Sequence, residues 1–128
     1  MQRFMLKSKI HRATITEANV DYIGSITIDS ELMRLADIHE YEKVHVVSID
    51  SGVRLETYAI SGDKDSGIIC LNGAAARLMK PGEKVIILAY ALAQEEELAD
   101  WKPHVVFVDE NNRPSHLLCL IGENPSQP

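Results

Sequence analysis

Short β-rich runs that end at turn-forming residues are the feature of this sequence that most limits its fold. Two of them, residues 44–49 and 53–60, are joined by Asp50-Ser51-Gly52, a connection with the composition of a hairpin turn. The other expected strands cover residues 4–11, 25–28, 68–71, 85–92 and 105–108. Seven short strands predict a single, mainly β domain, a compact barrel to which small helices are added.

The first and the sixth of these runs carry different burial patterns. The first run alternates, with Phe4, Leu6, Ser8 and Ile10 set against Met5, Lys7, Lys9 and His11. A period of two predicts one buried face, so we expect Lys9 and His11 to share the other face. The run 85–92 is apolar nearly throughout and predicts a central strand that is buried on both faces.

Two short helices are expected between the strands. Asp29 or Ser30 is a good N-cap for a helix that continues through Leu35. Asn72 is a candidate N-cap for a helix over residues 73–79, which Pro81-Gly82 would stop. The last residues, 122–128, hold two prolines and no apolar pattern, so we expect them to fray.

Composition narrows the classes of function. A chain of 128 residues is too small for the usual nicotinamide, flavin or pyridoxal domains. A net charge of −6 opposes broad contact with nucleic acid. The longest apolar run, residues 85–93, is about half a membrane span. No signal peptide is visible, so a cytoplasmic location is expected, with Cys70 and Cys119 as reduced thiols.

Few residues suggest chemistry by pattern alone. The five histidines form no metal-ligating motif, so no metal site is expected. Arg54 and Tyr58 lie on one face of an expected strand, about 13 Å apart, and could serve a small dicarboxylate. Asn72-Gly73-Ala74-Ala75 would expose backbone N–H groups to an anion. The alternatives, a surface arginine beside a half-buried tyrosine and an ordinary capped helix, remain open.

Taken together, the motifs resemble one family along residues 1–115, the pyruvoyl-dependent aspartate 1-decarboxylases. The order and spacing of these motifs make the resemblance specific, although each motif is weak alone. They are Met5-Leu6, Lys9, His11-Arg12, Tyr22, Gly24-Ser25, Arg54, Thr57-Tyr58-Ala59-Ile60, Asn72-Gly73-Ala74-Ala75-Ala76, Pro81-Gly82 and Trp101-Lys102-Pro103. Two features depart from the family: Val47 stands where some members carry an aromatic residue, and the sequence after Arg113 is individual.

The resemblance implies a fold and a maturation reaction. The fold would be a six- to seven-stranded double-psi β-barrel with short helices, assembled as a homotetramer with active sites at subunit interfaces. The precursor would cut itself between Gly24 and Ser25, giving chains 1–24 and 25–128. In the family, the threonine matching Thr57 holds the Gly24 carbonyl. Ser25 would become a pyruvoyl group, and no pyridoxal phosphate or metal would be needed. Maturation is unaided in some members and needs a helper protein in others.

The resemblance also implies an activity, the decarboxylation of L-aspartate to β-alanine and CO₂ for pantothenate and coenzyme A synthesis. The pyruvoyl group at residue 25 would form a Schiff base with the substrate amine, and Tyr58 would be the proton donor. Lys9 and Arg54 would bind substrate carboxylate, and Asn72 would orient the intermediate. Thr57 with Gly73, Ala74 and Ala75 would complete the pocket.

Two other classes stay open at this stage. One is a non-catalytic β-barrel interaction or regulatory module, in which Gly24-Ser25 is an uncut turn. The other is a self-processing hydrolase in which Ser25 ends as a free N-terminal nucleophile.

Overall fold

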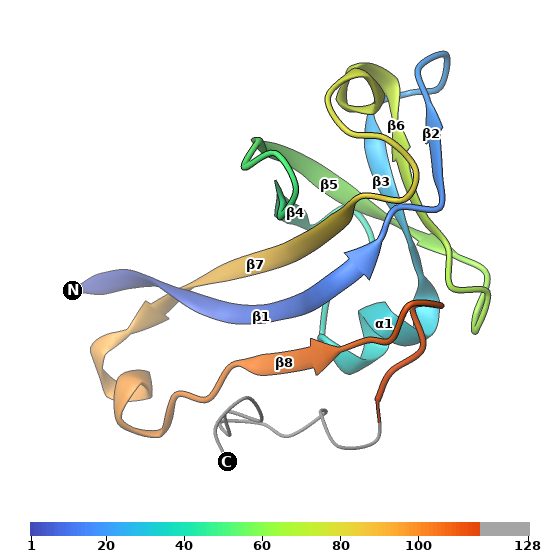
Figure 1. Cartoon of the computed structure of the whole chain (residues 1–128). Helices are drawn as coiled ribbons and strands as arrows, with labels where there is room; N and C mark the ends of the chain where they lie inside the picture. Colours follow the sequence, from blue (N-terminus) through green and yellow to red (C-terminus); the bar gives the residue numbers. More distant parts are fainter. Residues whose placement is uncertain (116–128) are drawn as a thin grey trace.

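The computed structural model describes residues 1–115, and the expectations for residues 122–128 and Cys119 lie outside this range. The prediction of a mainly β fold with short helices is confirmed, with eight strands in place of the expected six or seven (Figure 1). The strands are β1 (Gln2–Thr14), β2 (Glu17–Asn19), β3 (Ser25–Asp29), β4 (Lys43–Ser48), β5 (Arg54–Gly62), β6 (Ile69–Asn72), β7 (Lys84–Gln94) and β8 (His104–Phe107). The helical segments are α1 (Ser30–Leu35) and the 3₁₀ helices η1 (Gly73–Arg77) and η2 (Glu95–Asp100).

The strands form one strongly bent sheet in the order β2-β6-β3-β5-β4-β7-β1-β8. Strand β5 joins its two parts. Residues 54–58 of β5 pair antiparallel with β4, whereas residues 59–62 pair parallel with β3. Figure 1 shows β5 running from the β4 side of the molecule to the β3 side. The longest ladder, between β1 and β7, fixes the first strand to the middle of the chain.

The core is made of aliphatic side chains from both parts of the sheet and from α1. Fully buried members include Ile10, Ile26, Ile28, Leu32, Val44, Val46, Ile69, Leu71, Val85 and Ile87. The chain is poor in aromatic residues, so shape matching among these branched side chains fills the interior. One continuous cluster contains all of them.

The alternation predicted for the first strand is wrong in its first half because of a β-bulge. The register slips between Leu6 and Ser8, so that Leu6 pairs with Tyr90 and Ser8 pairs with Ala89. The extra residue moves Phe4 and Leu6 to the face that carries Lys9 and His11. Phe4 is accordingly 80% exposed, whereas Ser8 and Ile10 are buried.

The prediction that the apolar run 85–92 is buried on both faces is also wrong. Strand β7 is central, between β4 and β1, but its burial alternates. Val85, Ile87 and Ala89 face the core, while Ile86 and Leu88 are only half-buried on the other face. Because the outer face of this central strand is also apolar, apolar and polar residues do not alternate in the sequence although burial does.

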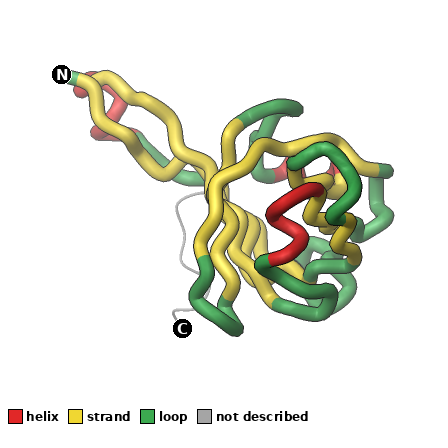
Figure 2. The backbone as a smooth tube through the Cα atoms, turned by 90° about the horizontal axis from the view of Figure 1, so that it is seen from above, coloured by secondary structure: helices red, strands yellow, loops and turns green. Residues whose placement is uncertain are grey.

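The start of β1 and the end of β7 form an arm that projects from the body of the molecule (Figure 2). The tip of the arm is η2, which begins with the exposed residues Glu95, Glu96 and Glu97. Leu92 on the arm is 51% exposed, so the arm presents apolar surface together with Phe4. No helix among residues 1–115 is long and apolar enough to span a membrane.

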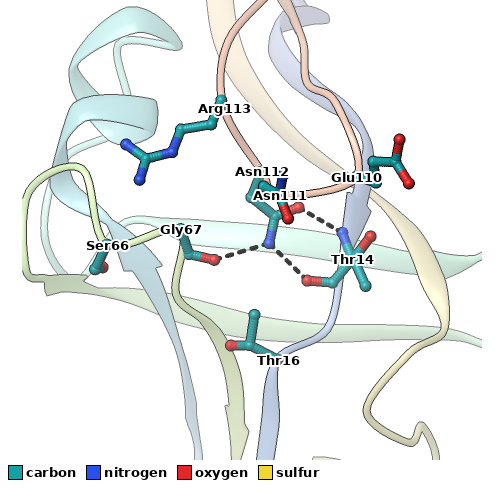
Figure 3. Close-up of a pocket in the computed structure, with 8 residues that line it drawn as sticks. All are labelled: Thr14, Thr16, Ser66, Gly67, Glu110, Asn111, Asn112 and Arg113. Atoms are coloured by element: carbon teal, nitrogen blue, oxygen red, sulfur yellow. Dashed lines mark hydrogen bonds between the residues drawn. The ribbon is translucent and has the colours of Figure 1, made fainter.

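Two buried polar side chains hold the loop before β6 and the segment after β8 in place. Asp29 caps α1 as predicted, accepting from the Glu31 N–H (2.8 Å), and it also accepts from the N–H groups of Asp65 (3.0 Å) and Gly67 (2.8 Å). Asn112, which is 1% exposed, accepts from Thr14 N–H (2.7 Å) and donates to the carbonyls of Thr14 and Gly67 (both 2.8 Å). These bonds fasten the segment after β8 to β1 (Figure 3).

We expect Asn112→Ala to lower the free energy of unfolding by about 2–4 kcal/mol, because the buried side chain loses three hydrogen bonds and their partners are left unpaired. Urea titration at one protein concentration measures this change. Asn111→Ala, at the exposed neighbour, is the control and should cost less than about 1 kcal/mol. Equal losses in the free energy of unfolding for the two variants would show that the Asn112 hydrogen bonds do not stabilise the fold.

Candidate active site

Ser25 lies at the start of β3 and is only 2% exposed. Its hydroxyl accepts a hydrogen bond from Asn72 Nδ2 (2.9 Å) and donates to the carbonyl of Ile23 (3.4 Å). The pairing of β3 with β6 sets this contact, because Ser25 and Asn72 are directly opposite each other. The buried hydroxyl therefore has both a donor and an acceptor within the chain.

Asn72 does not cap a helix as the sequence suggested. Its side chain makes no capping hydrogen bond to η1, and η1 is a single 3₁₀ segment. The amide instead turns into the sheet, where Nδ2 also donates to Thr27 Oγ1 (3.1 Å) and Oδ1 accepts from Cys70 Sγ (3.3 Å). A residue that caps helices well also bonds well across strands, so sequence alone favoured the wrong partner.

Thr27 and Cys70 are site residues that sequence reasoning missed. They lie two residues beyond Ser25 and two before Asn72, so the period of two puts them on the same face as that pair. This spacing is the signal that could have found them. Burial raises the pKa of the Cys70 thiol, and the nearby Glu17 carboxylate raises it further. Cys70 is therefore a neutral hydrogen-bond donor, and it is buried and not in a disulfide, which agrees with the predicted reduced thiol.

Gly73 brings the turn after β6 against the Gly24-Ser25 bond. It has a positive φ of 69°, and a methyl group on it would lie 2.6 Å from the Cα of Gly24 and 2.8 Å from its nitrogen. Gly24 itself has no positive φ, so it is not the residue that needs special backbone freedom. The position that needs the conformational freedom of glycine is therefore Gly73.

Lys9, His11, Arg54 and Tyr58 occupy the outer face of the other part of the sheet. Cross-strand pairs connect Lys9 to Leu88, Leu88 to His45 and His45 to Glu56, and a second row runs from His11 through Ile86 and Val47 to Arg54. Paired residues share a face, so the predicted common face of Lys9 and His11 and that of Arg54 and Tyr58 prove to be the same one.

This outer face is rich in cations. Burial lowers the pKa of His11, and the charges of Lys9 and Arg12 lower it further. Its ring packs on Phe107, with centroids 5.0 Å apart. A neutral imidazole therefore lies beside Lys9, whose ammonium makes no ion pair with any of residues 1–115. A face of this kind attracts anions although the whole chain is acidic.

Thr57 and Tyr58 link the two groups of residues along β5. Ile26 on β3 pairs with Ala59 on β5, and the two strands are parallel. The residues just before this pair, Ser25 and Tyr58, therefore occupy matching positions on adjacent strands. Thr57 faces the other side, opposite Val44, and within the described chain its hydroxyl makes no hydrogen bond to Gly24. The Tyr58 ring packs against Tyr41, with centroids 6.4 Å apart.

The described chain therefore holds two groups of candidate residues and no bond between them. No hydrogen bond or ion pair joins Lys9 or Arg54 to Ser25 within residues 1–115. Ala74 is exposed beside Gly73, and Ala75 packs on the core. The same part of the chain contains no group of three His, Cys, Asp or Glu side chains that could hold a metal ion.

Comparison with known proteins identifies the family. The model of the family described as Aspartate decarboxylase matches residues 1–115. The chain belongs to the aspartate decarboxylase family. The family resemblance expected from the sequence is thereby confirmed, and the mainly β architecture agrees with the double-psi β-barrel that it implies.

Individual members of the aspartate decarboxylase family are similar over nearly their whole length. The aspartate 1-decarboxylase of Thermoanaerobacter pseudethanolicus is 58% identical over 117 residues, which cover 91% of this chain and all of that protein. The Clostridium kluyveri enzyme is 64% identical over 88% of both chains, and that of Myxococcus xanthus is 59% identical over 88% of this chain and 87% of its own. The crystal structure of the computationally designed msDPBB_sym2 protein matches with a TM-score of 0.42 and 16% identity, covering 70% of this chain and 99% of the designed one.

We expect Gly73→Ala to cost at least about 3 kcal/mol of stability, because backbone strain is joined by overlap with Gly24. Gly52→Ala is a matched control: Gly52 has a similar φ of 77°, but a methyl group there meets nothing within 4 Å. This control should cost about 1 kcal/mol, from backbone strain alone. Urea unfolding of both variants measures the difference, and equal values would mean that the approach to Gly24 does not constrain Gly73.

Proposed function

We infer that the chain is an aspartate 1-decarboxylase, a carboxy-lyase that converts L-aspartate to β-alanine and CO₂ and so serves pantothenate synthesis. The observation that carries this conclusion is the identity of 58–64% to proteins of that name over nearly the full length of both. The buried Ser25 and Asn72 pair at the Gly24-Ser25 bond supports the same conclusion from the chemistry of this chain.

We propose that the chain first cuts itself between Gly24 and Ser25. Ser25 Oγ attacks the Gly24 carbonyl carbon, the C–N bond breaks, and the acyl group moves to oxygen as an ester. Loss of the Cα proton of residue 25 then breaks the Cβ–O bond and releases the Gly24 carboxylate. Water displaces the nitrogen as ammonia and leaves a ketone, the pyruvoyl group, on chain 25–128. Chain 1–24 is the other product.

Several contacts support this reaction at residue 25. Asn72 Nδ2 donates to Ser25 Oγ, which stabilises negative charge on that oxygen as it becomes a nucleophile. Gly73 presses on Gly24 and limits the conformations of the bond to be cut. We propose from the family resemblance that Thr57 holds the Gly24 carbonyl, which requires its side chain to turn from the face opposite Val44.

A pyruvoyl group supplies a ketone that binds the substrate amine covalently and accepts the electrons that decarboxylation releases. The site suits it, because residue 25 is buried and the Asn72 amide lies beside it. Asn72 orients the reacting groups from this position. Gly73, Ala74 and Ala75 form a wall of small residues that lets the substrate approach.

The outer face binds and protonates the substrate. Lys9 and Arg54 are cations on this face, and the arginine fork suits a carboxylate. Tyr58 lies on the same strand as Arg54, and Ser25 lies at the matching position of the adjacent strand β3. We therefore propose that Tyr58 donates the proton to the substrate carbon that loses CO₂. No metal and no pyridoxal phosphate take part in this proposal.

We propose that the active sites form at subunit interfaces of a homotetramer in the cytoplasm, with or without a maturation helper. The absence of a hydrogen bond or ion pair from Lys9 or Arg54 to Ser25 within residues 1–115 supports this proposal, since a second copy could bring cations to residue 25. The projecting arm, with exposed Phe4 and Leu92, supplies apolar surface for such contacts.

Denaturing mass spectrometry of the purified protein tests the self-cleavage. We expect two chains, 1–24 and 25–128, with no free amine on the second. An intact chain would favour a non-catalytic module or an unprocessed precursor, and a second chain that begins with serine would favour a hydrolase. Ser25→Ala should abolish the cut, because it removes the nucleophile. Ser8→Ala, at another buried serine, should cut normally.

We expect Tyr58→Phe to mature normally and to lose at least about 100-fold in kcat for aspartate decarboxylation, because the phenol proton is removed. Tyr41→Phe is the control, since Tyr41 is the ring neighbour of Tyr58 and is 72% exposed. Release of CO₂ from L-aspartate by the fully cleaved enzymes measures both. A Tyr58→Phe enzyme with wild-type kcat would remove Tyr58 from this role.

A further inference from the structure

The Arg54 guanidinium is held by a neighbouring histidine rather than by an acid. Arg54 Nη1 lies 3.3 Å from His45 Nδ1, and His45 Nε2 lies 3.4 Å from Glu56 Oε1. His45 is on β4, and its two partners are on β5, one strand away. We propose that His45 is a positioning residue that orients Arg54 toward a carboxylate of the substrate. This inference rests on the proposed function, in which Arg54 binds that carboxylate.

The partners of His45 determine which of its nitrogens carries the proton. A guanidinium can only donate hydrogen bonds, so Nδ1 must be the bare nitrogen that accepts from Arg54. A carboxylate can only accept, so Nε2 carries the hydrogen and points it at Glu56. His45 is therefore neutral and of a single tautomer while both contacts are made. The pair of contacts gives the ring a defined direction between Arg54 and Glu56.

Further neighbours hold the imidazole ring itself. The Tyr90 ring on β7 meets it edge to face, with centroids 5.3 Å apart, and the His45 side chain is only 23% exposed. Lys43 Nζ lies 3.4 Å from the other oxygen of Glu56, so each carboxylate oxygen has a partner on β4. Lys43, His45 and Tyr90, together with Phe4, line a cavity of about 330 Å³ on this outer face.

A neutral acceptor has a particular advantage for an arginine that binds anions. An aspartate or glutamate at position 45 would neutralise Arg54 and compete with the carboxylate of the substrate. His45 Nδ1 occupies one N–H of the guanidinium and leaves its other donors and its full charge available. Holding a long, exposed side chain in place also lowers the conformational entropy lost when the substrate binds.

Two substitutions at position 45 separate positioning from packing. His45→Gln keeps an acceptor for Arg54 and a donor for Glu56, whereas His45→Leu keeps bulk and loses both. We expect His45→Leu to raise KM for L-aspartate about tenfold, with kcat within about twofold. His45→Gln should stay within about threefold of the wild-type KM. Both variants are assayed after mass spectrometry shows complete cleavage, which neither should impair because residue 45 does not contact Ser25 or Asn72.

A wild-type KM in His45→Leu, or equal KM increases in both variants, would overturn the inference. A second measurement needs no variant: ¹⁵N NMR of the wild-type protein should show His45 protonated on Nε2 alone at neutral pH. Protonation on Nδ1 would contradict the contact with Arg54 whatever the kinetics. A wild-type protein that cleaves but does not decarboxylate aspartate would refute the proposed function instead, and the NMR result would still test the contact.

Discussion

The shared strand β5 is the constraint on which the rest of this structure depends. Its first half completes the antiparallel ladder with β4 and its second half pairs in parallel with β3. One strand therefore carries the substrate-binding candidates of the outer face and also runs beside the segment that holds Ser25. Because a slip of one residue would reverse every side chain on β5, the hairpin at Gly52 sets the orientation of Arg54 and Tyr58 together.

Local patterns predicted most of the fold because strand propensity, turn residues and the Asp29 cap all act over a few residues. The errors came from effects that involve distant partners. A bulge near Lys7 appears only when β1 is paired with β7, and the apolar outer face of β7 erased the alternation that would have revealed it. The face shared by Lys9 and Arg54 depends on three strand registers that no short segment specifies.

The same contrast between local patterns and distant partners separates the site residues that were predicted from those that were missed. Ser25, Tyr58, Arg54 and Lys9 were identified through family motifs, and the structure locates each of them. Thr27, Cys70 and His45 were missed because none is unusual in its own segment. Thr27 and His45 contact residues on a neighbouring strand, and Cys70 contacts Asn72 two residues along its own strand. Buried polar side chains are costly unless they are paired, and the bond from Asn72 to Thr27 forms only when β6 pairs with β3.

Because of the long ladder between β1 and β7, the strand pairing of the fold does not depend on the peptide bond before Ser25. Residues 2–14 are fastened to β7 along their whole length, and residues 17–19 are fastened to β6. On the other side of the bond, β3 is held by both β5 and β6. Severing the chain at this point would leave every strand with its partners, so the small fragment would stay bound as a noncovalent subunit while the new chain end gained room to move.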